Sequence, residues 1–195
     1  DVVIISDVDE ILRRDIATSL KFCNVPLPAV AETSFYYYSA HWKKRFRWNH
    51  PNIVSGRDVR QGISIELLRQ GVKRNKNGWM VRSKSILRNA GWHFSYFMKV
   101  NEIVKKLQSF SHTEYRSIAD NPLQILSSVC TGTDLFSRDP DTENLDYIKE
   151  MTDMPSCILE SPSLWSRFTS YDPIGDPVCS SSSSLSWMSF SSHLI

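Results

Sequence analysis

The chain has 195 residues, of which 41% are hydrophobic and 23% are charged, so it is long enough for one sizeable domain or for part of a larger one. Its 23 basic and 21 acidic residues leave a net charge of +2, which excludes a global electrostatic attraction to nucleic acid or anionic lipid. No apolar run approaches the ~20 residues of a membrane-spanning helix, and the four cysteines form no CxxC pair, which argues against a zinc site.

The chain opens inside a predicted strand, so we expect upstream residues to be missing. Residues 2–5 are all apolar, a pattern typical of a strand covered on both faces, as in α/β sheets. Residues 42–48 alternate between aromatic and basic side chains, which predicts one strand with an aromatic face and a basic face. The sequence NHPN (49–52) then predicts a turn before a further strand.

The second half of the chain contains a predicted hairpin and a predicted helix. Residues 79–97 suggest two strands joined by a turn at 89–91. Residues 101–110 predict a helix with Asn101 as N-cap and an apolar stripe. The last 35 residues contain 13 serines without periodicity. We therefore expect a folded domain over 1–160 and a serine-rich, disordered or foreign tail over 161–195.

Three acids follow the first predicted strand: Asp7, Asp9 and Glu10. Residues i and i+2 of an extended chain project to the same face about 7 Å apart, so Asp7 and Asp9 are predicted to point together, with Val8 turned towards the core. Paired carboxylates suit a hard cation such as Mg²⁺ or Mn²⁺, which often completes its shell with substrate phosphates. Ligands of open α/β sheets bind outside the strand ends. The alternative is a solvated acidic turn without a ligand.

Two phosphate chemistries fit a D-x-D after an apolar strand. One is the haloacid-dehalogenase type of phosphatase, in which the first aspartate is a nucleophile. Glu10 directly after Asp9 departs from that pattern, and no later pair of aspartates supplies a convincing metal motif. The other is transfer of a sugar from a nucleotide-sugar.

Five sequence segments, taken together and in their order along the chain, distinguish these two chemistries. They are DVVIISDVDEI, YYYSAHWKKRFRW, NAGWHFSYF, KKLQSFSHTEY and GTDLFSRDPDTENLDYI. Together they closely resemble glycosyltransferase family 17, whose best-known member adds the bisecting GlcNAc to N-glycans, over about residues 1–160. The resemblance implies an α/β, GT-A-like (Rossmann-like) domain, present in part, with a mixed sheet flanked by helices. It also implies inverting transfer of GlcNAc from UDP-GlcNAc to a mannose of a glycoprotein or oligosaccharide acceptor, for protein N-linked glycosylation.

The resemblance also implies roles for individual residues. Asp9 would bind the Mn²⁺ or Mg²⁺ that bridges the diphosphate, and Asp7 would contact the ribose or the water shell of the metal. Inverting transfer needs a base at the acceptor hydroxyl, and Glu114 in SHTEY is the residue chosen for it. His93 would complete the metal shell or hydrogen-bond the acceptor, or is a core histidine. His112 would orient Glu114.

Aromatic residues offer further contacts to an acceptor. Trp92, Trp42 and Trp48 would stack on sugar rings, although aromatic residues at strand spacing are more often part of a core. The basic cluster KKRFR (43–47) is interpreted as a solvated face rather than a nucleic-acid site.

The resemblance finally implies a location and a limit. Relatives are Golgi membrane proteins with a lumenal domain, so membrane attachment would come from an N-terminal anchor outside this chain. The part of a GT-A fold that holds the nucleotide precedes the D-x-D, so we expect these residues alone to bind UDP-GlcNAc weakly. The alternative from another class is a catalytically inactive remnant that binds carbohydrate.

Overall fold

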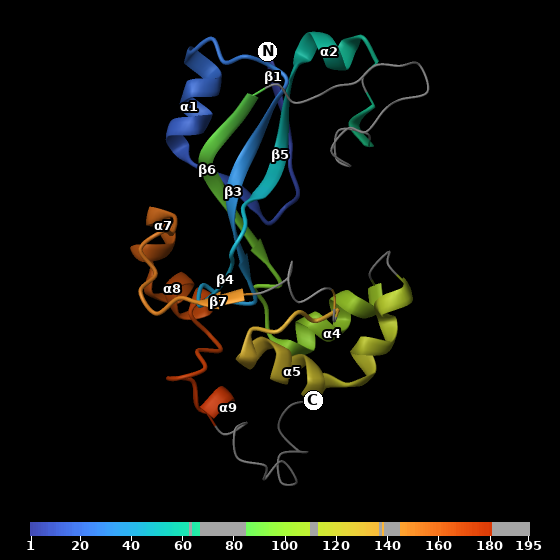
Figure 1. Ribbon diagram of the computed structural model, residues 1–195, viewed down its shortest axis with the longest axis vertical. Helices are drawn as coiled ribbons and strands as arrows, with labels where there is room; N and C mark the ends of the chain where they lie inside the picture. The colour runs from blue at the N-terminus through green and yellow to red at the C-terminus, as the bar shows by residue number, and fades with distance from the viewer. Residues whose placement is uncertain (63, 67–84, 110–112, 137, 139–144, 181–195) are drawn as a thin grey trace. The chain divides into compact units, whose positions relative to one another are not determined.

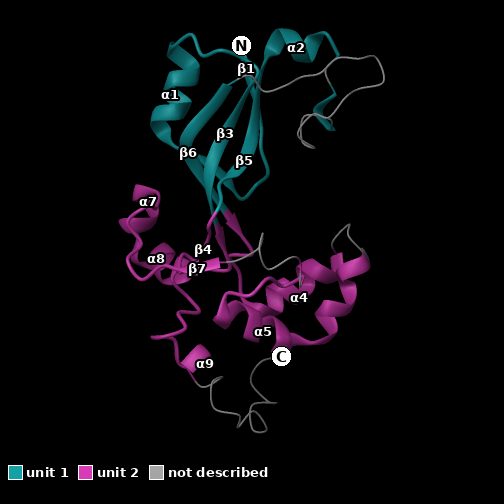
Figure 2. Ribbon diagram, viewed as in Figure 1, with its two compact units in different colours: residues 1–35, 46–93 teal, residues 36–45, 94–195 magenta. Residues whose placement is uncertain are grey.

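The computed structural model describes residues 1–62, 64–66, 85–109, 113–136, 138 and 145–180 (Figure 1). The chain divides into two units. Unit 1 comprises residues 1–35 and 46–93, and unit 2 comprises residues 36–45 and 94–195 (Figure 2). Each unit contains β-strands and its own helices, so the expected combination of a sheet with flanking helices is present.

The sheet of unit 1 has the strand order β1-β5-β3-β6-β2. Its strands are β1 (Val2–Ile5), β2 (Glu10–Leu12), β3 (Ala29–Tyr37), β5 (Trp48–Ser55) and β6 (Ser85–Ser95). The pairs β1–β5, β3–β5 and β2–β6 are antiparallel, and β2–β6 sets Glu10 opposite His93. The β1 strand pairs with β5, and Val2 and Ile4 are 39% and 42% exposed. The expectation that residues 2–5 are covered on both faces, as in a parallel α/β sheet, is therefore wrong.

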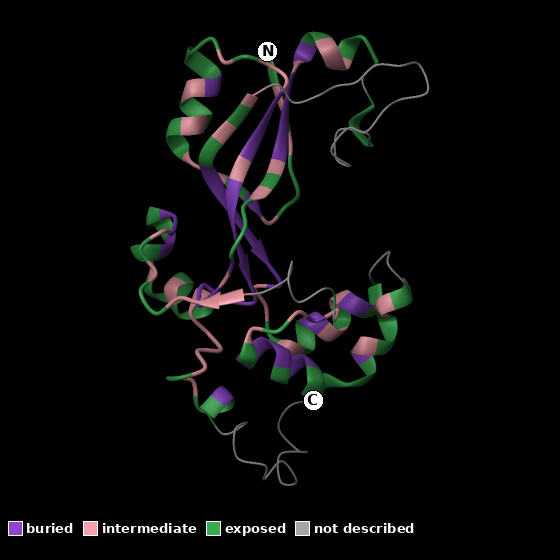
Figure 3. Cartoon of the chain, viewed as in Figure 1, coloured by how far each residue is buried: buried purple, intermediate pink, exposed green. Residues whose placement is uncertain are grey.

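Helix α1 (Arg14–Phe22) packs against this sheet. Its Leu20 belongs to a buried cluster with Ala29, Ala31, Ile53 and Ala90, contributed by β3, β5 and β6. The β3 strand is buried along nearly its whole length (Figure 3). Helix α2 (Gly56–Arg60) follows β5 and begins with a capping box between Ser55 and Asp58.

The structure replaces two predicted turns with continuous strands. Asn89 lies within β6 at φ +51°, a conformation that asparagine tolerates better than most residues. The side chain of Arg13 donates to the Asn89 carbonyl at 2.9 Å and holds this bend in place. Residues 49–52 likewise belong to β5 rather than to a turn. Residues 79–84 of the predicted hairpin lie outside the described part of the chain.

The strands of unit 2 are β4 (Trp42–Lys44) and β7 (Leu145–Tyr147), which pair antiparallel with Trp42 opposite Tyr147. The end of β3 pairs with β4 through Tyr36 and Lys43. Because β4 ends at Lys44 and β5 begins at Trp48, the expected single strand over 42–48 is wrong.

The helices of unit 2 begin with the predicted one. Helix α4 (Val100–Ser109) buries Ile103 and Leu107, as the apolar stripe predicted. It begins before Asn101, and the side chain of Glu102 accepts a hydrogen bond from the amide of Lys99 at 2.8 Å in place of the predicted cap. The others are η1 (Thr113–Asp120), α5 (Pro122–Thr131), α7 (Ser156–Leu159), α8 (Pro162–Phe168) and α9 (Pro177–Ser180). None of the helices in the described ranges is long and apolar enough to span a bilayer.

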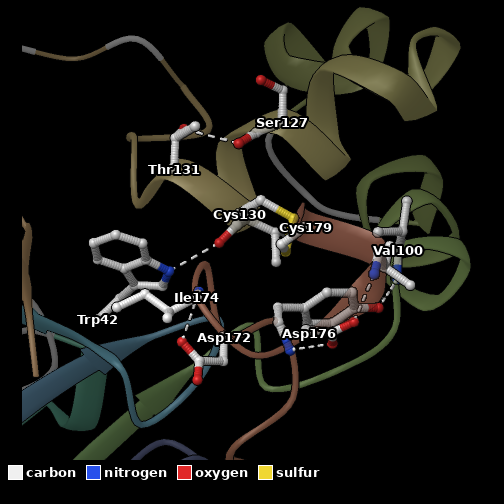
Figure 4. The surroundings of a disulfide bond; sticks show 12 residues. Trp42, Val100, Ser127, Cys130, Thr131, Asp172, Ile174, Asp176 and Cys179 are labelled. Carbon is white, nitrogen blue, oxygen red and sulfur yellow. Dashed lines mark hydrogen bonds between the residues drawn. A yellow bond between two sulfur atoms is a disulfide. The ribbon is translucent and has the colours of Figure 1, made fainter. Parts of the chain in front are cut away.

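The first part of the serine-rich segment is folded. Residues 161–180 contain α8 and α9, and a disulfide joins Cys179 of α9 to Cys130 of α5 (Figure 4). Both cysteines are buried with Leu126. The expectation of disorder from Ser161 onward therefore does not hold for 161–180, because serine content does not reveal a covalent tie to a distant helix. Residues 181–195 lie outside the described part of the chain.

Candidate functional site: the acidic turn of unit 1

The D-x-D residues lie in a turn between β1 and β2. The amide of Glu10 donates to the carbonyl of Asp7 at 3.2 Å and closes the turn. Val8 at its tip is fully exposed, Asp7 is exposed, and the side chain of Asp9 is 26% exposed. The expectation that Val8 turns to the core is wrong, because the chain turns here and does not continue as an extended strand.

The third acid, Glu10, is the buried centre of this turn, with a side chain that is 0% exposed. Its Oε2 accepts hydrogen bonds from the amide of Asp7 at 3.0 Å and from the hydroxyl of Ser6 at 3.1 Å. Its Oε1 accepts a hydrogen bond from the indole N–H of Trp48 at 2.8 Å. A carboxylate with this many donors fixes the backbone that carries Asp7 and Asp9.

These contacts determine the protonation of Glu10. Burial by itself raises the pKa of the Glu10 carboxyl, but the neighbouring His93 and the hydrogen bonds from Trp48 and the Asp7 amide outweigh it and hold the pKa below its ordinary value. The hydrogen bonds of Glu10 come from Trp48, Asp7 and Ser6, whereas Nδ1 of His93 lies 3.5 Å from Oε1 as an electrostatic neighbour. Glu10 is therefore an anion inside the sheet at neutral pH.

His93 lies between two acids. Its Nε2 is 3.6 Å from Oδ1 of Asp9, its Nδ1 is 3.5 Å from Glu10, and its side chain is 8% exposed. The β2–β6 register places it there, and its ring stacks on Phe35 with a centroid separation of 4.4 Å. The two ring nitrogens of His93 therefore face two different carboxylates.

Of the three aromatic residues expected at the acceptor, two are buried and one is half-buried. Trp92 is 6% exposed, and the guanidinium of Arg13 lies 4.1 Å from its ring centroid. Trp48 is half-buried and bonded to Glu10. Trp42 belongs to unit 2, is 7% exposed, and donates its indole N–H to the carbonyl of Val129 at 2.9 Å. Trp92 and Trp42 are therefore largely covered by the protein and expose little ring surface.

The residue expected to act as base belongs to unit 2. Glu114 lies in the first turn of η1 with an exposed side chain. This exposure makes the Glu114 carboxylate accessible to a ligand from solvent. His112, expected to orient it, lies outside the described residues. The structure thus brings together Asp7, Asp9, His93 and Trp48, and places Glu114 and Trp42 in the other unit.

The acidic turn suits a cation that a substrate phosphate also binds, rather than one that the protein holds alone. Among the residues that the structure describes, no group of three or more histidine, cysteine, aspartate or glutamate side chains is arranged to hold a metal ion. Asp7 and Asp9, on an accessible turn, offer oxygen ligands of the kind that Mg²⁺ and Mn²⁺ prefer. Two carboxylates fit such an ion when phosphate oxygens and water complete its shell.

Comparison with known proteins identifies the family. The family model of glycosyltransferase family 17 matches residues 1–163, which include the acidic turn, His93 and Glu114. The chain belongs to glycosyltransferase family 17. No curated protein and no solved structure matches it significantly. Family membership supports a transferase and decides against the haloacid-dehalogenase type of phosphatase.

Sequence reasoning missed the most buried residue of the acidic turn. Glu10 was noted as one of three acids, but neither its burial nor its bond to Trp48 was expected. A usable signal was present, since β2 is short and places Glu10 and Leu12 on the same side of the strand. Reading that alternation back from the apolar Leu12 points Glu10 towards the interior, and the turn closed by the Glu10 amide and the Asp7 carbonyl takes Val8 out of the pattern.

Proposed function

We propose that the protein is a metal-dependent, inverting glycosyltransferase that moves N-acetylglucosamine from UDP-GlcNAc to a mannose of an N-glycan-type acceptor. The observation that carries the proposal is the accessible turn of Asp7 and Asp9, which the buried Glu10 carboxylate holds in a chain of family 17. Two carboxylates on a fixed turn provide one side of a cation site whose other side is a diphosphate.

Each residue then has a role. Asp9 would hold Mn²⁺ or Mg²⁺, Asp7 would contact the ribose or the water shell of the ion, and His93 would orient Asp9 from 3.6 Å. The bound cation supplies neutralisation of the negative charge that develops on the departing UDP. Glu114 accepts the proton of the attacking mannose hydroxyl. The hydroxyl oxygen bonds to the anomeric carbon of GlcNAc, the bond from that carbon to UDP breaks, and UDP leaves with the electron pair.

The proposal includes a fold and a location. The domain is GT-A-like, with the D-x-D turn at the edge of its sheet. The protein resides in the Golgi membrane with this domain in the lumen. The Cys130–Cys179 disulfide supports an oxidising compartment, because cytosolic thiols are kept reduced.

The test is release of UDP from UDP-GlcNAc with Mn²⁺ and an N-glycan that carries a β-linked core mannose. We expect Asp9→Asn and Glu114→Gln each to reduce turnover by about 100-fold or more. Asp15→Asn and Asp120→Asn are the matched controls, because they remove exposed acids from the same two units and should leave turnover unchanged. Full turnover by both site variants would overturn the assigned roles.

The same assay separates the proposal from its alternative. A protein that releases no UDP under any metal or acceptor condition, yet binds an oligosaccharide, is a carbohydrate-binding member of the family without turnover. Equal turnover in EDTA and in Mn²⁺ would instead overturn the metal dependence and retain the transferase.

A further inference from the structure

Unit 2 contains a cavity that the proposed catalytic residues do not use. Its volume is about 740 Å³, within the ~300–1,000 Å³ range of small-molecule sites. The residues that line it come from the flank of β4, from β7 and the segment after it, from α8, and from residues 169–177. They include Tyr147, Lys149, Trp165, Ser166 and Asp172. We name this cavity the Trp165 pocket.

Hydrogen bonds fix one wall of the Trp165 pocket. Asp172 accepts hydrogen bonds from the Tyr147 hydroxyl at 3.1 Å and from the Ile174 amide at 3.0 Å. Asp176 accepts from the amides of Tyr171 and Val178 at 2.9 and 2.8 Å. The wall is also tied to α5 by the disulfide at Cys179 (Figure 4). A wall ordered before binding loses little conformational entropy when a ligand enters.

The β7 side of the pocket is held to this wall by His41. Its Nδ1 lies 3.2 Å from the carbonyl oxygen of Ile148, and its Nε2 lies 3.3 Å from that of Thr169. The His41 ring also stacks on Tyr147, with an angle of 11° between the two ring planes. The β7 side and the segment after α8 are thus joined through one buried side chain.

The lining combines aromatic rings with hydrogen-bonding groups. Trp165 and Tyr147 provide apolar faces, and Ser166, Lys149 and Asp172 provide a hydroxyl, an ammonium and a carboxylate. Burial raises the pKa of the Asp172 carboxyl, but bonds from the Ile174 amide and Tyr147 outweigh it and hold the pKa below its ordinary value. The carboxylate therefore stays ionised and accepts hydrogen bonds.

The charges of the lining select against anions. The lining contains two carboxylates, Asp172 and Asp176, and one lysine, Lys149. A nucleotide or a phosphate would meet net repulsion, because like charges in a partly enclosed site disfavour each other. A metal ion is also disfavoured, since both oxygens of Asp176 already accept backbone amides. The ligand that fits this lining is therefore neutral, with one apolar face and several hydroxyl groups.

We infer that the Trp165 pocket binds a neutral pyranose unit of a glycan, with an apolar sugar face on Trp165 and hydroxyl groups on Asp172 and Ser166. The inference rests on the proposed function, because it takes this pyranose to be a part of the acceptor glycan that does not react. Trp165 and the wall at 169–177 lie beyond the residues that the family model matches, so family membership does not assign this site.

The test is an NMR titration of the protein with the neutral pentasaccharide core of N-glycans, without donor or metal. We expect saturable binding with signal changes at the Trp165 indole. Trp165→Ala should weaken binding by about tenfold or more, and Trp165→Phe by less, because a smaller ring still stacks. Leu164→Ala is the matched control, since Leu164 is the 39% exposed neighbour on α8 and does not line the pocket.

A second variant guards against misfolding at Trp165. Asp172→Asn keeps an oxygen for the Tyr147 and Ile174 bonds but removes the charge, and should weaken binding several-fold while circular dichroism stays unchanged. The inference is overturned if the pentasaccharide does not bind, if the folded variants bind as tightly as the parent, or if UDP displaces the saccharide from the pocket.

The outcome is independent of catalysis. If Asp9→Asn abolishes UDP release and the pentasaccharide still binds at Trp165, both proposals stand. If transfer fails in every variant while this binding persists, only the catalytic proposal is lost. If transfer is normal and the pocket variants change nothing, only the pocket inference is lost.

Discussion

The indole N–H of Trp48 donates to Oε1 of Glu10 at 2.8 Å inside the sheet of unit 1. We predict that Trp48→Phe destabilises the protein by about 1–3 kcal/mol, because a buried carboxylate oxygen loses its donor. Chemical denaturation measures the change. A double-mutant cycle with Glu10→Gln should show a coupling of at least ~0.5 kcal/mol. Strictly additive changes in unfolding free energy would contradict the hydrogen bond between Trp48 and Glu10.

The stabilisation by Glu10 should depend on pH. The folded-state pKa of Glu10 lies below its ordinary value of 4.5, so its contribution is complete above about pH 4.5 and is lost as pH falls through the folded-state value. Glu10→Gln places an amide beside the donors from Ser6, Asp7 and Trp48. We predict that it destabilises the protein most near pH 7, and that the difference in unfolding free energy narrows towards pH 3.

The control for this pH dependence is Glu150→Gln, which removes an exposed carboxylate from unit 2. Its difference from the parent should stay small across the same range. A Glu10→Gln difference that is constant or that grows as pH falls would show that the folded protein does not favour the ionised carboxylate.

His93 should influence a cation through Asp9. We predict that His93→Phe, which keeps a ring against Phe35, weakens Mn²⁺ binding by about tenfold or more. Electron paramagnetic resonance of free Mn²⁺ measures the affinity without a sugar donor. His50→Ala is the control, because the structure places His50 against Asn52 and Trp48. Unchanged Mn²⁺ affinity in His93→Phe would exclude the positioning role.

Gly132 is required where α5 ends. Its φ is +65°, and an added Cβ would lie 2.3 Å from the ring of Trp42. Gly62 provides the comparison, since its φ is +88° and no described atom lies within 4 Å of such a Cβ. We predict a cost of ~1–2 kcal/mol for Gly62→Ala from backbone strain, and a further ~1–3 kcal/mol for Gly132→Ala from overpacking. Equal thermal stabilities of the two variants would contradict the predicted collision between a Cβ at position 132 and the Trp42 ring.

The disulfide should stabilise unit 2. It joins residues separated by 49 positions, so removing it by a Cys130→Ala, Cys179→Ala double variant should cost about 2–4 kcal/mol. The matched control is Cys23→Ala with Cys157→Ala, which changes two exposed free cysteines. We expect dithiothreitol to lower the unfolding midpoint of the control and to leave that of the disulfide-free variant unchanged.

Local patterns predicted the elements that depend on neighbouring residues. The helix over 100–109 was recognised because its apolar stripe and early Glu102 are properties of one segment. The strand over 42–48 and the turn at 89–91 were wrong, because alternation and turn-forming residues also occur where strand pairing overrides them. Likewise, a short serine-rich segment did not reveal that Cys179 is joined to α5.

Family membership could be recognised from contiguous motifs without a fold, and the same motifs make Asp7, Asp9 and Glu114 candidate site residues. The pairing of distant strands was needed to find that Glu10 is the buried centre of the acidic turn, with Trp48 and His93 beside it, and that Trp165 and Asp172 line a pocket in unit 2. The physical reason is that burial and hydrogen-bond partners depend on which strands pair and in which register, and such pairing joins residues far apart in the chain.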